Sequence, residues 1–251
     1  MVVQTRPQPL PFLVTTEMPC PYLPGRVERK VVTDLSGPAA MENYEILSRA
    51  GFRRSHSIAY RPACPGCSAC VAVRVVVGDF VPGPSLRRIE RRNEDLSATL
   101  RLTRGTPEQF ALFTRYLGGR HQDGEMVGMS LHEYVAMVED SPLHSNLVEL
   151  RDGRGRLVGC CLVDWTRDGV SAVYSFYDVE QPRRSLGSYL ILWLIREGAR
   201  RRLPYAYLGY WVAGSRKMAY KSRFQPLEGY GPNGWQRLAD RNEKSEPRDR
   251  P

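Results

Sequence analysis

The sequence lacks any long apolar run. No stretch approaches the roughly 18 consecutive apolar residues that a membrane-spanning helix requires, and residues 1–9 do not have the basic-then-apolar layout of a secretion signal. We therefore expect a cytoplasmic protein with no membrane partner. Hydrophobic residues make up 42% and charged residues 25% of the 251 positions. This balance excludes disorder of the whole chain.

Lysine and histidine are scarce. Only 4 of the 36 basic residues are lysine, and the 4 histidines form neither an i,i+4 pair nor an HExxH motif, so we assign them no metal role. With 27 acidic residues the net charge is +9, and residues 1–104 hold 15 basic against 9 acidic side chains. A GC-rich genome would explain the preference for arginine over lysine. It would not explain the net charge, which favours an anionic partner.

Periodicity divides the chain into two blocks between polar or proline-rich ends. We expect a flexible N-terminus over residues 1–15, a smaller cysteine-containing α+β domain over 16–104, a second domain over 105–239 and a disordered tail over 240–251. In the first block the patterns predict a helix within 36–51, strands at 52–60 and 71–77, and a short helix from Ser85.

The second block predicts a recognisable order of elements. Thr106 and Ser130 each begin a helix with a capping-box residue three positions later. Three β-rich runs joined by short glycine turns predict an antiparallel meander; they are 146–151, 157–165 and 170–178. A helix from Ser185 and a strand at 205–210 follow. This order is that of the GCN5-related N-acetyltransferase fold, which we therefore expect in the C-terminal domain of an α+β protein.

Cysteines cluster in two places. Cys64, Cys67 and Cys70 form two overlapping CxxC units, with Cys20 as a candidate fourth ligand. Four thiolates suit Zn²⁺ or an iron–sulfur cluster, structural or regulatory. The alternative is that these cysteines are small buried residues or redox thiols. Cys160 and Cys161 lie in an apolar run and are expected in the core.

Two basic clusters are candidate anion sites. Arg87, Arg88, Arg91 and Arg92 are spaced to form one cationic helix face, which suits a tRNA backbone or is simply a solvated surface. The second cluster, over 216–224, places aromatic rings among cations, an arrangement that suits a nucleotide end. Its candidate substrate-binding and catalytic side chains are Arg216, Lys217, Tyr220, Lys221 and Arg223.

The loop before the helix at Ser185 is where this fold usually holds the phosphates of an acyl donor. Arg184, Ser185 and Gly187 match the acetyl-CoA motif only in part, because Tyr189 stands where a small residue is expected. Asp178, at the end of the third strand, could bind an amine or accept its proton, and it could equally cap the next turn. Tyrosine hydroxyls beside it, such as that of Tyr174, could stabilise an oxyanion.

Eight motifs, found in one order between about Cys20 and Leu238, resemble a known family. They are CPYLPGR at 20–26, GFRRS at 51–55, YRPAC at 60–64, RRN at 91–93, VYSFYD at 173–178, SLGSY at 185–189, YLGY at 207–210 and KMAYK at 217–221. The chain is similar to the aminoacyl-tRNA–protein transferases of the arginyltransferase superfamily, and most closely to the bacterial aspartate/glutamate leucyltransferases.

The resemblance implies that leucine passes from Leu-tRNA to the N-terminal Asp or Glu of a protein, which marks that protein for degradation by the N-end rule pathway. No cofactor is required for catalysis. Under this hypothesis Asp178, Tyr174 and Lys221 are catalytic, and Arg184, Ser185 and Gly187 bind the terminal adenosine of the tRNA or its phosphate. Eukaryotic relatives transfer arginine, so arginyl transfer is one alternative. The others are an acyl-CoA-dependent N-acyltransferase and a non-catalytic, metal-containing RNA-binding module.

Overall fold

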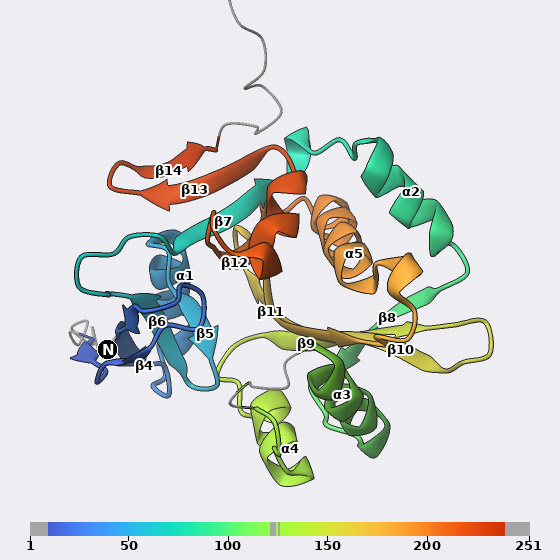
Figure 1. Ribbon diagram of the computed structural model, residues 1–251, viewed down its shortest axis with the longest axis horizontal. Coiled ribbons are helices and arrows are strands. Elements are labelled where there is room, and N and C mark those ends of the chain that lie inside the picture. Colours follow the sequence, from blue (N-terminus) through green and yellow to red (C-terminus); the bar gives the residue numbers. More distant parts are fainter. Residues whose placement is uncertain (1–9, 121–123, 125, 239–251) are drawn as a thin grey trace, which may run out of the picture.

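An eight-stranded mixed sheet forms the centre of the protein (Figure 1). In the computed structural model, which describes residues 10–120, 124 and 126–238, the strand order is β14-β13-β7-β12-β11-β10-β9-β8. The strands are β7 (Val71–Val76), β8 (Ser97–Leu102), β9 (Ser145–Arg151), β10 (Leu157–Thr166), β11 (Gly169–Tyr177), β12 (Tyr205–Trp211), β13 (Leu227–Gly231) and β14 (Gly234–Arg237).

The predicted meander and crossover are present. Strands β9, β10 and β11 pair antiparallel in sequence order, and helix α5 (Leu186–Arg200) carries the chain from β11 to its parallel neighbour β12. A parallel pair needs such a crossover because the chain must return to the end of the sheet where the first strand began, which a short turn cannot do. The order strand, strand, strand, helix, strand confirms the architecture expected for the C-terminal part.

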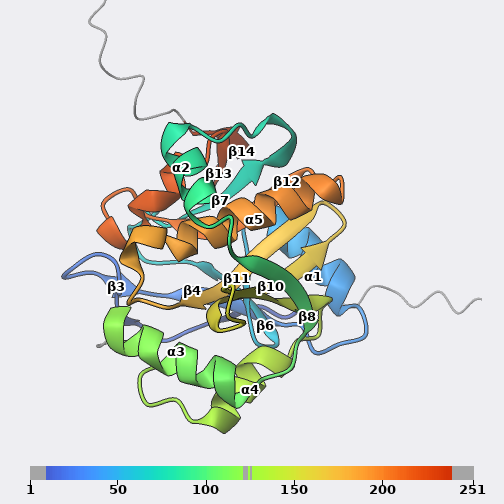
Figure 2. The ribbon, with the colours of Figure 1, turned by 90° about the vertical axis from the view of Figure 1, so that its right-hand side faces the viewer.

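Helices cover both faces of the large sheet (Figure 2). Helices α2 (Pro84–Arg92) and α5 pack on one face, and α3 (Pro107–Arg120) and α4 (Leu131–Glu139) pack on the other. Because successive strand residues point to opposite faces, Cys160 of β10 belongs to the core under α3 and Cys161 to the core under α5. Both cysteines are buried, as expected.

The two predicted capping boxes are formed. Before α3, the backbone N–H of Thr106 donates to Oε1 of Gln109, and the N–H of Gln109 donates to Oγ1 of Thr106. Before α4, Ser130 and Glu133 exchange the same pair of bonds. Each box satisfies backbone donors that the first helical turn would otherwise leave without partners.

The N-terminal part forms a smaller sheet in the order β1-β4-β6-β5, with helix α1 (Ala40–Arg49) packed against it. Its strands, and those of a separate two-stranded sheet, are β1 (Leu13–Val14), β4 (Lys30–Asp34), β5 (Arg53–Ser55) and β6 (Ile58–Pro62), then β2 (Met18–Pro19) and β3 (Val27–Glu28). The single strand expected at 52–60 is wrong. His56 adopts a left-handed conformation, with φ of 51°, and turns the chain into the β5–β6 hairpin.

The boundary expected at residue 104 does not separate the two sheets. Strands β7 and β8 precede residue 104, yet both belong to the eight-stranded sheet. At the N-terminus, Leu13–Val14 of the segment expected to be flexible pairs with β4. Residues 1–9 and the tail at 240–251, also expected to lack fixed structure, are outside the described residues. Among the helices that the structure describes, none has the length and apolar character needed to cross a bilayer.

Candidate active site

The parallel strands β11 and β12 separate soon after they meet. Their pairing covers only Gly169–Ser171 with Tyr205–Tyr207. Beyond it each strand carries an extra residue relative to its other neighbour, Val173 in β11 and Leu208 in β12. Bulges of this kind bend a strand. The two strands consequently diverge, and a cavity of about 160 Å³ lies at this level of the sheet.

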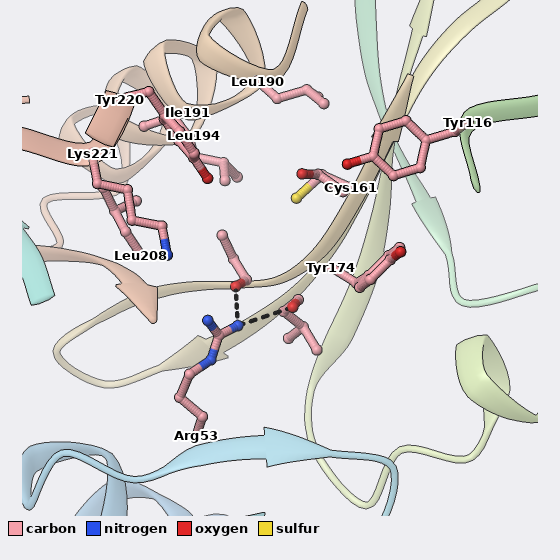
Figure 3. A pocket seen from close by; sticks show the side chains of 13 residues that line it. Arg53, Tyr116, Cys161, Tyr174, Leu190, Ile191, Leu194, Leu208, Tyr220 and Lys221 are labelled. Atoms are coloured by element: carbon pink, nitrogen blue, oxygen red, sulfur yellow. Dashed lines mark hydrogen bonds between the residues drawn. The ribbon is translucent and has the colours of Figure 1, made fainter. Parts of the chain in front are cut away.

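The cavity collects side chains from elements far apart in the sequence (Figure 3). It is lined by Arg53 of β5, Tyr116 of α3, Cys161 of β10, residues 172–175 of β11, Leu190, Ile191 and Leu194 of α5, Leu208 of β12, and Tyr220 and Lys221 of the 3-10 helix η3 (Arg216–Arg223). Among these described residues there are two cations and no carboxylate. The cavity is therefore suited to an anionic group.

Arg53 reaches the cavity from the small N-terminal sheet. Its Nη2 donates to the carbonyl oxygens of Ala172 at 2.8 Å and Val173 at 2.9 Å, both on β11 (Figure 3). The guanidinium passes β12 at Gly209, where a Cβ atom would lie 1.3 Å from Nη1. Gly209 also has φ of +75°, a conformation that glycine adopts without strain. Gly209 thus leaves the space that Arg53 needs.

Lys221 lines the cavity from η3. The residue is 6% exposed, and its Nζ donates to the carbonyl oxygen of Tyr210 at 2.5 Å. Burial, and next the positive charge of Arg53, lower the pKa of Lys221 to about 7. A large share of this amine is therefore neutral near pH 7, and a neutral amine can accept a proton.

Tyrosine hydroxyls complete the polar part of the lining. Burial raises the pKa of Tyr174 to about 12, and burial likewise raises the pKa of Tyr220 to about 12 although the charge of Arg53 opposes it. Both hydroxyls stay protonated at neutral pH and can donate hydrogen bonds. Protonated donors inside a cavity can stabilise an oxyanion.

Asp178 follows β11 but does not line the cavity. Its Oδ1 accepts a hydrogen bond from the backbone N–H of Glu180 at 3.0 Å, and its Oδ2 accepts one from Nε2 of Gln181 at 2.8 Å. Both carboxylate oxygens thus hold the turn that leads to the 3-10 helix η2 (Pro182–Arg184). This geometry favours the turn-capping alternative over the expected role in orienting an amine.

Comparison with known proteins identifies the family. Residues 18–88 match the family described as "Arginine-tRNA-protein transferase, N terminus", and residues 108–231 match "Arginine-tRNA-protein transferase, C terminus". The aspartate/glutamate leucyltransferase of Paramagnetospirillum magneticum is 55% identical, over 91% of this chain and 93% of its own. The chain belongs to the aspartate/glutamate leucyltransferase family.

Other relatives carry the same name. The leucyltransferase of Rhodospirillum rubrum is 53% identical over 89% of this chain and 92% of its own, and that of Sphingopyxis alaskensis is 51% identical over 90% and 91%. The solved structure of L-PGS from Bacillus licheniformis aligns with a TM-score of 0.45 and 15% identity over 67% of this chain and 50% of that one. The two family matches and the three leucyltransferases confirm the family resemblance found from the motifs.

Among the described side chains of the basic cluster at 216–223, only Tyr220 and Lys221 line the cavity of this leucyltransferase-family chain. Arg223 is exposed, and its Nη2 donates to Oγ of Ser85 in α2 at 3.1 Å. Lys217 is exposed and is not part of the lining. The side chain of Arg216 is outside the described part of the structure. The cluster is thus divided between the cavity and the surface around it.

The loop before α5 is held in shape by its own contacts. Arg184 forms a two-bond ion pair with Asp95, at 2.7 and 2.8 Å. Ser185 has φ of 54°, and its carbonyl oxygen accepts hydrogen bonds from the first turn of α5. A Cβ atom at Gly187 would lie 2.8 Å from the ring of Tyr177. An anionic donor group that binds Arg184 must therefore compete with Asp95.

The predicted cationic helix face is present on α2. Leu86 and Ile89 are buried, whereas the four arginines of this face are exposed. They are Arg87, Arg88, Arg91 and Arg92. Glu90, on the same helix, is paired with Arg196 at 2.5 Å and so does not neutralise them. Contact of this face with tRNA stays a prediction.

The four N-terminal cysteines are free thiols and partly exposed. Burial first, and then the nearby Cys64, Cys20 and Cys67, raise the pKa of Cys70 to about 11. The four thiols are therefore neighbours, as a shared ligand set requires. No three Cys, His, Asp or Glu side chains in the described residues are placed as ligands of one metal ion. A Zn²⁺ ion or iron–sulfur cluster at these cysteines stays a prediction.

Proposed function

We propose that this protein transfers leucine from Leu-tRNA to the α-amine of proteins that begin with Asp or Glu. One observation supports it most directly: a chain of the leucyltransferase family contains a cavity with the guanidinium of Arg53 and no carboxylate among the lining residues that the structure describes. An acceptor with an acidic first side chain needs a cationic pocket, because a carboxylate taken out of water must be paired. The cavity meets this need.

The chemistry requires few groups. The aminoacyl ester is already activated, so the protein mainly has to hold a neutral amine against the ester carbonyl and stabilise the tetrahedral oxyanion. A C–N bond forms and the ester C–O bond breaks, while the amine loses one proton and the ribose oxygen of the tRNA leaves with one. We assign the removal of the proton to Lys221 and the stabilisation of the oxyanion to the hydroxyl of Tyr174.

The product of this reaction begins with leucine. We propose that it enters the N-end rule pathway of protein degradation and that the reaction takes place in the cytoplasm. The support for this role is the chemistry of the product. Transfer adds one leucine before the Asp or Glu of the acceptor and leaves the rest of that protein unchanged. A fusion protein that begins with Asp would then have a shorter half-life in cells that contain this protein than in cells that lack it.

One assay tests the activity itself. The purified full-length protein is incubated with Leu-tRNA or Arg-tRNA and with peptides that begin with Asp, Glu, Lys or Ala, and the products are weighed by mass spectrometry. We expect leucyl transfer to the Asp and Glu peptides alone. Transfer from Arg-tRNA would support the arginyl alternative, and acylation that depends on acyl-CoA would support the acyltransferase alternative. Binding of tRNA without any transfer would support the RNA-binding module.

A further inference from the structure

We infer that Arg53 binds the side-chain carboxylate of the acceptor's first residue and thereby makes the protein prefer Asp and Glu over Asn and Gln. The inference rests on the proposed function and names the residue that selects the acceptor. Arg53 comes from the N-terminal sheet, outside the part of the chain that supplies most of the cavity.

Two adjacent arginines of β5 differ in what balances their charge. Arg54 is paired with Asp164 by two hydrogen bonds, at 2.7 and 2.8 Å, and both side chains are 0% exposed. Arg53 takes part in none of the ion pairs formed among the described residues, and its hydrogen bonds go to two backbone carbonyls. Arg53 is partly buried, and a guanidinium that is partly removed from water without a counter-charge is unfavourable. An anion supplied by the substrate would balance it.

The groups around Arg53 do not supply that anion. The ionisable side chains with the largest influence on it are tyrosines, namely Tyr60, Tyr44, Tyr210 and Tyr22. Burial raises the pKa of Tyr22 and Tyr44 to about 12, so both are neutral at pH 7. The other basic residue of the cavity, Lys221, is an amine and supplies no anion either. An entering carboxylate therefore meets a positive site with no competing acid in its lining.

The position of Arg53 is fixed before any substrate arrives. Two carbonyl oxygens of β11 hold Nη2, and the gap at Gly209 confines Nη1. Nη2 uses its donors on these two carbonyls, so an entering carboxylate meets the positive charge of a fixed guanidinium together with the remaining donors on Nη1 and Nε. The amide of Asn or Gln would present an NH₂ group to a donor and leave the charge unbalanced. Discrimination between an acid and its amide therefore follows from Arg53 alone.

A tRNA phosphate is the other anion that could enter. If Arg53 held a phosphate, its loss would raise the KM for Leu-tRNA and would slow transfer to every peptide equally. If Arg53 holds the acceptor side chain, its loss changes the ratio between acidic and amide peptides and leaves the KM for Leu-tRNA unchanged. The two roles are thus separated by comparing peptides rather than by activity alone.

The test compares wild type with Arg53→Gln and Arg53→Lys on peptides that begin with Asp and Asn and are otherwise identical. Truncating one partner of a buried charge pair costs about 2–5 kcal/mol, so kcat/KM for the Asp peptide should fall roughly 30-fold or more in Arg53→Gln. The value for the Asn peptide should change little, so the Asp/Asn ratio falls by the same factor. Arg53→Lys keeps the charge but not the contacts that fix the guanidinium, and it should recover part of the ratio. Arg49→Gln, which changes an exposed arginine of α1, serves as the matched control.

Calorimetric binding of the same two peptides in the absence of tRNA separates this inference from the proposed function. Tighter binding of the Asp peptide that is lost in Arg53→Gln supports Arg53 even if no leucine is transferred. An unchanged Asp/Asn ratio in a folded Arg53→Gln protein, or equal losses for both peptides, would overturn the inference. Should Arg53→Gln not fold, the same ratio measured for Arg53→Met decides, since unchanged discrimination without the positive charge would also overturn the inference.

Discussion

Lys221 is buried and lines the cavity. Its role can therefore be tested through the pH dependence of the reaction. Its pKa is lowered to about 7, first by burial and next by Arg53. A base with this pKa is neutral and active above pH 7 and becomes protonated and inactive as the pH falls through 7. The acceptor amine, with a typical pKa of about 7.7–8.0, must also be neutral to attack. Two ionisations should therefore limit the wild-type reaction at low pH.

We expect log kcat/KM of the wild type to rise with a slope near two below pH 7. In Lys221→Met and Lys221→Arg only the acceptor amine titrates, so the slope should fall to one, and the rate should drop by about 100-fold or more because general base catalysis is lost. Peptide transfer measured between pH 6 and 9 gives the slopes. Lys221→Arg places a permanent charge at this position and Lys221→Met places none, so the same loss of slope in both variants would assign the missing ionisation to Lys221 itself. A slope of two in either variant would remove Lys221 as the base.

Asp178 gives a second prediction at the same scale, because its two oxygens already accept hydrogen bonds within the turn at 178–181. We expect Asp178→Asn to keep transfer within about threefold of wild type and to lower the free energy of unfolding by about 0.5–1.5 kcal/mol, the usual value of one hydrogen bond. Asp178→Ala, which removes both acceptors, should be less stable still. A large loss of transfer in a stable Asp178→Asn protein would restore the catalytic role predicted from the sequence.

The residue scale also shows how far the site could be predicted. Tyr220 and Lys221 were found because cations and rings alternate within a few positions, and Tyr174 was found because it lies near the end of a predicted strand. Arg53 was quoted only as part of a motif, because it lies more than a hundred positions before the strand that it contacts. Two adjacent arginines in a strand must point to opposite faces. The arginine pair in the GFRRS motif therefore indicated that each arginine needs a partner on its own face of the strand.

At the scale of elements, α2 presents four arginines on one exposed face. Each arginine that neutralises a phosphate releases counterions, so the dependence of tRNA affinity on salt reports the number of contacts. We expect a single change to Gln at Arg87, Arg88 or Arg91 to reduce the slope of log K against log salt by about one. Arg49→Gln removes the same charge from α1, which lies on the other side of the molecule (Figure 1), and should leave the slope unchanged. If all variants gave the same slope as wild type, this face of α2 would not contact the tRNA.

The four cysteines belong to two elements, the β2–β3 hairpin and the loop after β6. We expect protein purified without oxygen to contain Zn or Fe, and Cys67→Ser to lose that metal together with part of its thermal stability, because a metal bound by two elements holds them together. Cys160→Ala, in the core, should retain the metal. Elemental analysis decides the matter. Absence of both metals from the wild type would eliminate the site.

Elements whose signals are local were predicted well. The capping boxes of α3 and α4, the meander β9–β11 and the helix α5 all follow from residues within one short window. Several strands were not predicted, β4, β13 and β14 among them, and two further features show why. The β5–β6 hairpin depends on a left-handed His56, which sequence patterns seldom indicate. Strand β8 lacks a clear strand pattern in the sequence because most of its residues are polar or exposed. It lies at the edge of the sheet and pairs only with β9.

At the scale of the whole molecule, the position of β7 could not be predicted. Its pattern correctly indicated a buried strand, but its partners β12 and β13 lie more than a hundred positions later. Pairing over such distances depends on which apolar faces meet, and no local pattern specifies that. The result is that the first part of the chain completes the sheet of the second. The small sheet adds Arg53 to the cavity and Arg54 to the core below it.

Arg54 and Asp164 join the small sheet to the large one. Asp164 on β10 accepts two hydrogen bonds from Arg54 on β5 and a third from Oγ of Ser145, at 2.6 Å. Removing one partner leaves a buried charge without its counter-charge. We therefore expect Asp164→Asn or Arg54→Met to lower the free energy of unfolding by about 3–5 kcal/mol. The exposed pair Arg49–Asp168 provides the comparison, and Arg49→Gln should cost about 0–1 kcal/mol.

The double variant Arg54→Met/Asp164→Leu separates the value of the pair from the cost of leaving one charge alone. Because it buries no unpaired ion, it should be more stable than either single variant, although Ser145 and the carbonyl of His56 lose a partner. Unfolding in guanidinium chloride measures all four proteins of the cycle. Additive losses would mean that Arg54 and Asp164 act independently. A double variant that unfolds in two steps, with the small sheet first, would show that this pair is what makes the two sheets unfold together.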